Sequence, residues 1–411
     1  MSNYKTVFFI LGILQIILGV SMIFPIITQF IFEELDSSFI SASIITVIFG
    51  TLFLLSNFEN DRKLNLQHAF LLTSLSWISV AIFGSLPFIF SDLNLSVTDS
   101  FFESMSGITT TGSTIITDLN SAPKAILVWR AILQWLGGIG IIVMAITLMP
   151  IMNVGGMQLL KVSSSDASEK ILPKTKEITI RIIIIYLVLT FLCAFFYKIF
   201  GMKFFDSLTH SMTTIATGGF SNYNDSIGHF NNFKIEITSM IFIILGSIPF
   251  IAYIKYLSGK KNIFYTDTQI KSFIKIIFFS ILILFLYLTL FNKSFSTVSF
   301  RSVSFNVISI LTGTGYVTTN FDSWGNFPLI YFLILMFIGG CAGSTTCGIK
   351  IFRVQILYLF LKNQLKKIIS PRGIFVIKYD NNNVNEKFMA SIITFIYLYI
   401  IIFFIIAALL S

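Results

Sequence analysis

Threonine and glycine recur together at matching places in three short segments of this 411-residue chain. The first segment reads DSFFESMSGITTTGS (99–113), and the second reads DSLTHSMTTIATGGF (206–220). The third, SVSFNVISILTGTGY (302–316), is a weaker match but places Gly315 and Tyr316 at the same positions. A lone Thr-x-Gly is more often a turn, whereas three matching segments indicate a repeated structural unit.

These residue types are suited to binding a dehydrated monovalent cation such as potassium. Backbone carbonyls supply several oxygens of moderate field strength without a net charge. Glycine lets the backbone aim carbonyls at one axis, and the segments hold no carboxylate, which disfavours a calcium-type site. We therefore expect an ion filter formed by Thr110, Thr111, Gly112, Ser113, Thr217, Gly218, Gly219, Phe220, Gly313, Thr314, Gly315 and Tyr316.

The stretch before each glycine is too short to span a bilayer and too polar to lie in lipid. Asp99-Ser100 and Asp206-Ser207 offer capping side chains, so we expect helices to start there. Threonine and glycine then end the helix, and non-helical backbone at membrane depth must line a cavity or be enclosed by protein. The pattern predicts half-helices, each followed by an extended loop beside an aqueous path.

The composition indicates that the bilayer is the solvent for most of the chain. Hydrophobic residues make up 55% and charged residues 11%, and the mean hydropathy is +0.86. Spans of about 20 apolar residues can cross a membrane as helices. We expect such spans near residues 5–28, 38–57, 68–90, 126–151, 179–200, 235–257, 272–291, 328–360 and 388–410.

The net charge of +9 is a topology signal rather than a nucleic-acid site. Most of the 28 lysines and arginines fall on one side if the N-terminus is inside, so we expect a cytoplasmic N-terminus. Membrane lipid is then an expected partner, and nucleic acid is not.

Catalytic and metal-binding chemistry is not expected. Cys193, Cys341 and Cys347 lie within apolar spans and form no ligand cluster, so we expect free thiols. The 3 histidines are scattered, and no catalytic constellation is visible. We expect no enzyme activity and no cofactor, with potassium only as the transported ion.

An aspartate follows each filter segment: Asp118, Asp225 and Asp322. They could ring the outer mouth and concentrate cations by their charge. Alternatively, they are ordinary loop aspartates that cap turns.

One long apolar span is interrupted by small and polar residues, which predicts a broken helix beside a cavity. Close packing against a neighbouring helix is the alternative. The interrupting residues are Gly339, Gly340, Cys341, Ala342, Gly343, Ser344, Thr345, Thr346, Cys347 and Gly348.

The chain resembles the Trk/Ktr/HKT superfamily of potassium transporters, and most closely its bacterial TrkH-type subunit. The resemblance runs from the N-terminus to the last residue. It is carried by SGITTTGST (106–114), IATGGFSN (215–222), LTGTGYVTTNF (311–321), WRAILQWLGGIGIIVMA (129–145), GGMQL (155–159) and GGCAGSTTCGIK (339–350).

The resemblance implies an all-α membrane protein whose helix–pore loop–helix units surround a pseudo-fourfold axis. It implies that Gly112, Gly219 and Gly315 are filter glycines, that 339–348 is an intramembrane gating loop, and that Gly313 replaces the usual threonine. It also implies uptake of potassium across the bacterial inner membrane, a homodimer, and a cytoplasmic nucleotide-binding regulatory subunit of the TrkA/KtrA type.

We divide the chain by its repeats into an accessory hairpin and successive pore units. Only the first helix of a fourth unit is visible, so we expect a truncated or fragmentary family member. The units are 1–65 (hairpin), 66–177, 178–269, 270–385 and 386–411 (incomplete fourth unit).

Several other polar residues have two readings. We expect Glu103, His210 and Arg130 to be structural residues that hold the pore segments. Lys350 and Arg353 are either electrostatic barriers to the ion or positive-inside anchors.

Two other functions stay open. Broken helices and repeats also occur in secondary transporters of organic solutes. A non-conducting subunit or fragment is the other alternative, because a fourth filter loop is not seen.

Overall fold

The computed structural model describes most of the chain. The described residues are 4–34, 36–58, 65–147, 171–290, 300–373, 375–380, 382–384 and 386–411. The GGMQL motif (155–159) therefore lies outside the described residues.

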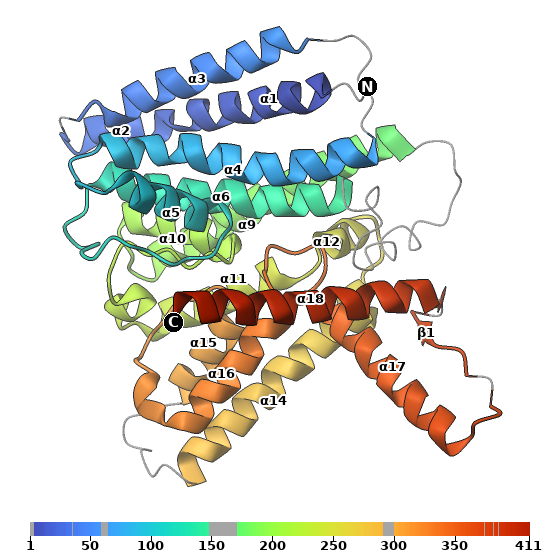
Figure 1. Ribbon diagram of the computed structural model, residues 1–411. Helices are drawn as coiled ribbons and strands as arrows, with labels where there is room; N and C mark the ends of the chain where they lie inside the picture. Colours follow the sequence, from blue (N-terminus) through green and yellow to red (C-terminus); the bar gives the residue numbers. More distant parts are fainter. Residues whose placement is uncertain are drawn as a thin grey trace.

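Long apolar helices dominate the described residues. Seven are long and apolar enough to cross a membrane, and α1 and α2 count together as one of them. Most of these helices run side by side, while α14 is inclined to them (Figure 1). Their bounds are α1 (Lys5–Ser21), α2 (Ile23–Ile31), α3 (Ser38–Ser56), α4 (Leu66–Phe90), α6 (Lys124–Thr147), α9 (Ile171–Ile199), α14 (Thr268–Leu290) and α18 (Glu386–Leu410).

Two of the expected spans are broken. An 86° bend separates α11 (Phe233–Ser247) from α12 (Phe250–Leu257). Pro249 lies at this bend and has no N–H for a helical hydrogen bond. The other break separates α16 (Asn326–Ile338) from α17 (Ile351–Ile369), as the interrupted apolar pattern predicts.

Three short helices precede the threonine–glycine loops: α5 (Val97–Ile108), α10 (Phe204–Ile215) and α15 (Phe300–Leu311). Each has 12 residues, fewer than a spanning helix needs. The expected starting points of the first two were wrong by a few residues. Ser96 caps α5 by accepting the Asp99 N–H. The Asp206 carboxylate instead accepts bonds from Asn222 and Tyr223, so it fastens the following loop.

The remaining elements are short. They are η1 (Ser226–Phe230), α13 (Ile263–Thr266), η2 (Asp322–Trp324) and a two-stranded antiparallel ribbon of β1 (Lys378–Tyr379) and β2 (Asn382–Asn383). Apart from this ribbon, the described elements are helical, which confirms the expected all-helical class.

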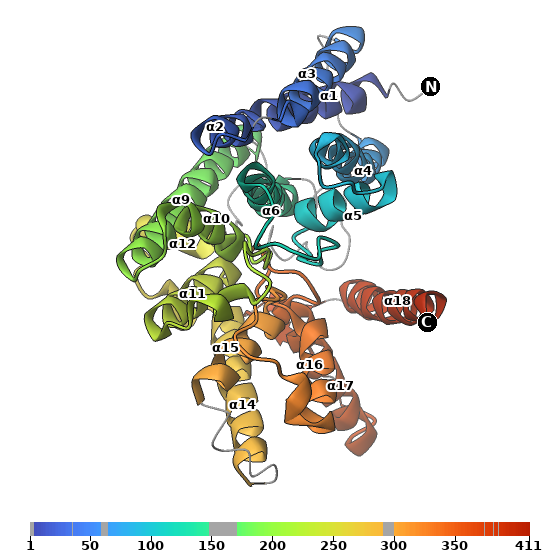
Figure 2. The same ribbon diagram turned by 90° about the vertical axis from the view of Figure 1, so that its left-hand side faces the viewer.

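Viewed along the long helices, the elements surround a centre (Figure 2). The segments that follow α5, α10 and α15 converge there, and α18 stands to one side beside α17. Helices α1 and α3 pack against each other and reach the rest of the molecule mainly through α4. Helices α1 and α3 thus lie outside the ring of elements that surrounds the centre.

The hairpin depends on glycine for its close packing. A Cβ added to Gly12 on α1 would lie 2.7 Å from the Gly50 carbonyl oxygen on α3. Small residues allow such close backbone approach between membrane helices.

We predict that Gly12→Ala forces α1 and α3 apart and costs about 1–3 kcal/mol of stability. Thermal unfolding of the detergent-solubilised protein measures this as a lower melting temperature. Gly140→Ala is the matched control, because no atom of the described residues lies within 4 Å of an added Cβ at that helical glycine. Equal melting temperatures for the two variants would contradict the packing argument.

Candidate functional site

The second threonine–glycine loop is in direct contact with both the first and the third. A Cβ added to Gly112 would collide with the Gly218 carbonyl oxygen, and one added to Gly219 would collide with the Thr314 carbonyl oxygen. The loops therefore follow one another around the centre of the molecule. At Gly315, no atom in the described part of the chain lies within 4 Å of an added Cβ.

The loops also share a backbone conformation. The three aligned glycines have φ of +83° (Gly112), +80° (Gly219) and +82° (Gly315). Two residues earlier, φ is again positive: 56° at Thr110, 51° at Thr217 and 72° at Gly313. Glycine adopts this region without a steric cost, so the replacement of the usual threonine at Gly313 suits the backbone. In each loop, two residues of positive φ are separated by one residue. The three loops therefore present the same backbone conformation to one centre.

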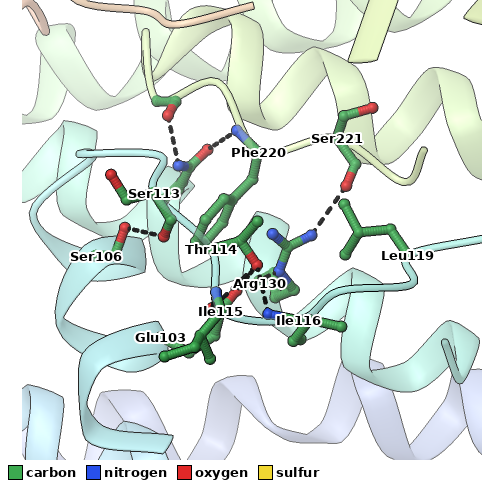
Figure 3. Close-up of polar contacts among 12 residues, drawn as sticks. Glu103, Ser106, Ser113, Thr114, Ile115, Ile116, Leu119, Arg130, Phe220 and Ser221 are labelled. Carbon is green, nitrogen blue, oxygen red and sulfur yellow. Dashed lines mark hydrogen bonds and ion pairs between the residues drawn. The ribbon is translucent and has the colours of Figure 1, made fainter. Parts of the chain in front are cut away.

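A buried ion pair lies behind the first two loops (Figure 3). The Arg130 Nε donates to the Glu103 carboxylate over 2.7 Å, and both side chains are at most 1% exposed. Glu103 also accepts bonds from the Thr114 hydroxyl and the Ile115 N–H, so it holds the end of the first loop.

Arg130 extends this network to the second loop. Its Nη1 donates to the Ser221 carbonyl oxygen over 2.9 Å, and its guanidinium lies 3.9 Å from the Phe220 ring centroid (Figure 3). The structure thus places Arg130 behind the loops, as expected, rather than at their centre. One buried pair joins two loops that are distant in sequence.

His210 occupies the place on α10 that Glu103 has on α5. Its Nδ1 is 2.8 Å from the Asp206 carbonyl oxygen, and its Nε2 is 2.9 Å from the Ser221 hydroxyl. Both ring nitrogens are thus engaged within the same unit, which is the structural role expected for this residue.

The 339–348 loop lies directly against the first two threonine–glycine loops. The Thr217 hydroxyl donates to the Thr345 hydroxyl over 3.1 Å, and the Thr110 hydroxyl is 3.6 Å from the Cys347 sulfur. Residues 339–346 are buried, and Cys347 is partly exposed. The positive-φ threonines of the first two loops therefore touch the loop that interrupts the α16–α17 span.

The same loop is seated on the α11–α12 bend. Thr345 donates its N–H and its hydroxyl to the Gly246 carbonyl, and the Cys341 N–H donates to the Ser247 carbonyl. In return, the Gly343 carbonyl accepts the Phe250 N–H. The two broken spans thereby satisfy each other's backbone groups at membrane depth.

Lys350 follows the 339–348 loop in sequence and bonds back to it. Its ammonium donates to the Thr346 carbonyl over 2.6 Å, and the Thr346 hydroxyl accepts the Gly340 N–H. The ammonium is therefore bonded within the loop region, a role that neither reading of the sequence included. Arg353 instead lies 4.0 Å from the Phe395 ring centroid on α18.

The three aspartates expected at the mouth are all exposed. Asp118 accepts bonds from the Ser121 hydroxyl and the Asn120 N–H, so it caps a turn, as in the alternative reading. The Ser121 hydroxyl and the backbone N–H groups of Asn120 and Ser121 lower the pKa of Asp118, so that it keeps its negative charge to a lower pH. Asp225 and Asp322 lie at the starts of η1 and η2.

The three cysteines are free thiols, as expected. Among the described residues, no group of three His, Cys, Asp or Glu side chains could hold a metal ion.

Comparison with known proteins identifies the family. Residues 35–411 match the TrkH family, described as cation transport proteins. The chain belongs to this family. The predicted family is confirmed, and TrkH proteins are multi-pass membrane transporters rather than enzymes.

Curated TrkH-family proteins match nearly the whole chain. The Trk system potassium uptake protein TrkI of Halomonas elongata is 36% identical over 391 residues, which are 94% of this chain and 79% of that protein. TrkH of Escherichia coli is 33% identical over 407 residues, 98% of this chain and 84% of that protein. The crystal structure of the potassium transporter TrkH from Vibrio parahaemolyticus superposes with a TM-score of 0.90 at 32% identity, covering 98% of this chain and 85% of that one.

Sequence reasoning missed how the loops are held. Hydroxyls at matching places of the first and third segments brace their loops: Ser106 and Ser309, and Thr109 and Thr312. The signal is present in the sequence, because these serines and threonines occupy matching positions when segments 99–113 and 302–316 are aligned. The contacts of α6 with the second loop could not be predicted in this way, because α6 is not part of the repeated segments.

We predict that Glu103→Gln or Arg130→Met lowers stability by about 3–5 kcal/mol, because either change leaves a buried charge unpaired. The melting temperature and the 86Rb⁺ uptake should both fall. Arg181→Met is the control, since the Arg181–Glu177 pair is 50% and 63% exposed and such pairs contribute about 0–1 kcal/mol. Equal losses in the exposed and buried pairs would refute the role given to Glu103 and Arg130.

Proposed function

We propose that this TrkH-family chain mediates potassium uptake through a channel-like pore. The observation that carries the proposal is the convergence of three loops with the same alternation of positive-φ residues. The relatives named Trk system potassium uptake proteins support potassium as the ion. The filter would consist of residues 110–113, 217–220 and 313–316.

The pore needs no chemical step. Carbonyl oxygens replace water around the ion, and no carboxylate lies within the filter segments to retain a divalent cation. A membrane potential, negative inside, contributes about 2.3 kcal/mol per charge per 100 mV, which drives accumulation of a monovalent cation. The exposed aspartates Asp118, Asp225 and Asp322 would raise the local cation concentration at the outer mouth.

Gly219→Ser tests the filter. The new side chain would collide with the Thr314 carbonyl and strain a backbone with φ +80°, so we predict reduced potassium-over-sodium selectivity. The measurement is 86Rb⁺ uptake, with sodium as competitor, in a bacterium that lacks its own potassium transport.

Gly315→Ser is the matched comparison. It carries the same backbone strain without a neighbouring atom within 4 Å, so its loss of selectivity should be smaller. Uptake and selectivity unchanged by Gly219→Ser would refute the filter and favour the secondary-transporter alternative.

We propose further that residues 339–348 gate this pore. The loop contacts Thr110 and Thr217 of the filter, and its own conformation is closed by Lys350. Displacement of the loop would therefore open the path below the filter.

Lys350→Met tests the gate. Loss of a charge-assisted bond should free the loop and raise basal 86Rb⁺ uptake by about tenfold. A freed loop should also expose Cys347 and speed its alkylation by a water-soluble thiol reagent. The reaction reports on Cys347 because Cys193 and Cys341 are fully buried.

Two variants are the controls: Lys350→Arg keeps the charge, and Lys362→Met removes an exposed lysine from α17. If Lys350→Met behaves like Lys362→Met in both assays, the gate assignment is wrong.

The setting of the pore is also part of the proposal. The basic loops support a cytoplasmic N-terminus in the bacterial inner membrane, with units at 1–65, 66–177, 178–269, 270–385 and 386–411. Family likeness supports a homodimer in lipid, controlled by a nucleotide-binding subunit of the TrkA/KtrA type. The basic segments 258–271 and 361–387 are candidate docking surfaces for that subunit.

A further inference from the structure

The first and third loops are braced by hydroxyl groups of their own units. In the first loop, the Ser106 hydroxyl donates to the Ser113 carbonyl over 2.6 Å, and the Thr109 and Thr111 hydroxyls are 2.8 Å apart. In the third loop, the Ser309 hydroxyl donates to the Tyr316 carbonyl over 2.7 Å, and the Thr312 and Thr314 hydroxyls are 2.8 Å apart. These bonds join each loop to the helix before it.

The second loop lacks the residues for these bonds. Ala216 and Gly218 stand at the places of the paired threonines and carry no hydroxyl. Thr213 stands at the place of the serine, but its hydroxyl bonds to the Thr209 and His210 carbonyls and to the Tyr316 hydroxyl. Its own pore helix therefore does not brace the second loop in the same way.

Gln134 of α6 supplies bonds to this loop from another unit. Its Nε2 donates to the Gly218 carbonyl over 2.6 Å, and its Oε1 accepts the Phe220 N–H over 3.0 Å. The side chain is 0% exposed. Its amide thus holds the backbone on both sides of Gly219.

Gln134 and Gly218 fit each other sterically. A Cβ added to Gly218 would collide with the amide carbon and oxygen of Gln134. Glycine at 218 therefore makes room for the glutamine amide, which stands where the other two loops have a threonine side chain.

We propose that Gln134 is a positioning residue for ion selectivity, doing in the second loop what the paired threonine hydroxyls do in the first and third. The proposal rests on the filter assignment above. Filter carbonyls discriminate between ions by their number and positions. Releasing the backbone beside Gly219 should therefore weaken discrimination before it stops conduction.

Gln134→Met is the first test, because it keeps the volume of the side chain and removes both hydrogen bonds. We expect potassium-over-sodium selectivity of 86Rb⁺ uptake to fall by about tenfold, with uptake still measurable. Gln15→Met is the matched control: Gln15 on α1 is also 0% exposed, but it bonds to Ser79 on α4 and not to any of the three loops, so selectivity should be unchanged. Unchanged selectivity in Gln134→Met would overturn the proposal.

A compensating variant separates bracing from general damage. Gly218→Thr alone should abolish selective uptake, because its side chain collides with Gln134. Gln134→Ala/Ala216→Thr/Gly218→Thr removes the glutamine and supplies the threonine pair of the other loops, so it should regain selectivity relative to Gln134→Ala. If the triple variant is folded, by melting temperature and gel filtration, but no more selective than Gln134→Ala, the equivalence of the two braces is wrong.

The outcomes also distinguish this inference from the filter assignment. Selectivity that responds to Gly219→Ser but not to Gln134→Met overturns only the role of Gln134. Selectivity that responds to neither overturns both.

Discussion

Backbone N–H and C=O groups at membrane depth must be hydrogen-bonded within the protein or face water. Three non-helical loops after half-helices, and a fourth segment within the α16–α17 span, all have to meet this constraint. The 339–348 loop meets it by exchanging bonds with the α11–α12 bend: Gly246 and Ser247 accept from it, and Gly343 accepts from Phe250. A break in one span is thus matched by a break in another.

The same constraint explains why charged and polar side chains are buried behind the loops. Glu103 and Arg130 are costly to bury singly, but together they satisfy an N–H of the first loop and a carbonyl of the second. Polar groups of α6 therefore connect the loop after α5 to the loop after α10, which lies more than 100 residues further along the chain. This connection would let the loops of the proposed filter move as one rigid body, although they come from separate units.

The proposed filter and the proposed gate are in contact with each other. Thr110 and Thr217 belong to the filter segments, yet their hydroxyls face Cys347 and Thr345 of the proposed gate. Gly313 has no hydroxyl for such a contact, and Cys347 is its nearest neighbour, 3.6 Å from an added Cβ. Movement of the 339–348 loop would consequently change the contacts of Thr110 and Thr217 in the proposed filter.

The sequence by itself determined the class of protein, the three short helices and the alignment of the glycines that share a positive φ. Apolar spans, half-helices and a repeated Thr-Gly motif are local patterns, and each follows from the residues within one segment. The sequence also indicated the break at 339–348, because small polar residues interrupt an apolar run. It misplaced the starts of α5 and α10, because Ser96 caps α5 in place of Asp99 and the Asp206 carboxylate binds Asn222 and Tyr223 of the following loop.

Only the tertiary structure decided how these parts hold one another. Gln134 reaches Gly218 across 84 positions of sequence, Thr110 reaches Cys347 across 237, and neither pair belongs to a repeat. Lys350 could point to the membrane surface or back into the loop, and packing chose the loop. The physical reason is that a hydrogen bond depends on a separation of about 3 Å between atoms, which distant segments acquire only when the helices pack.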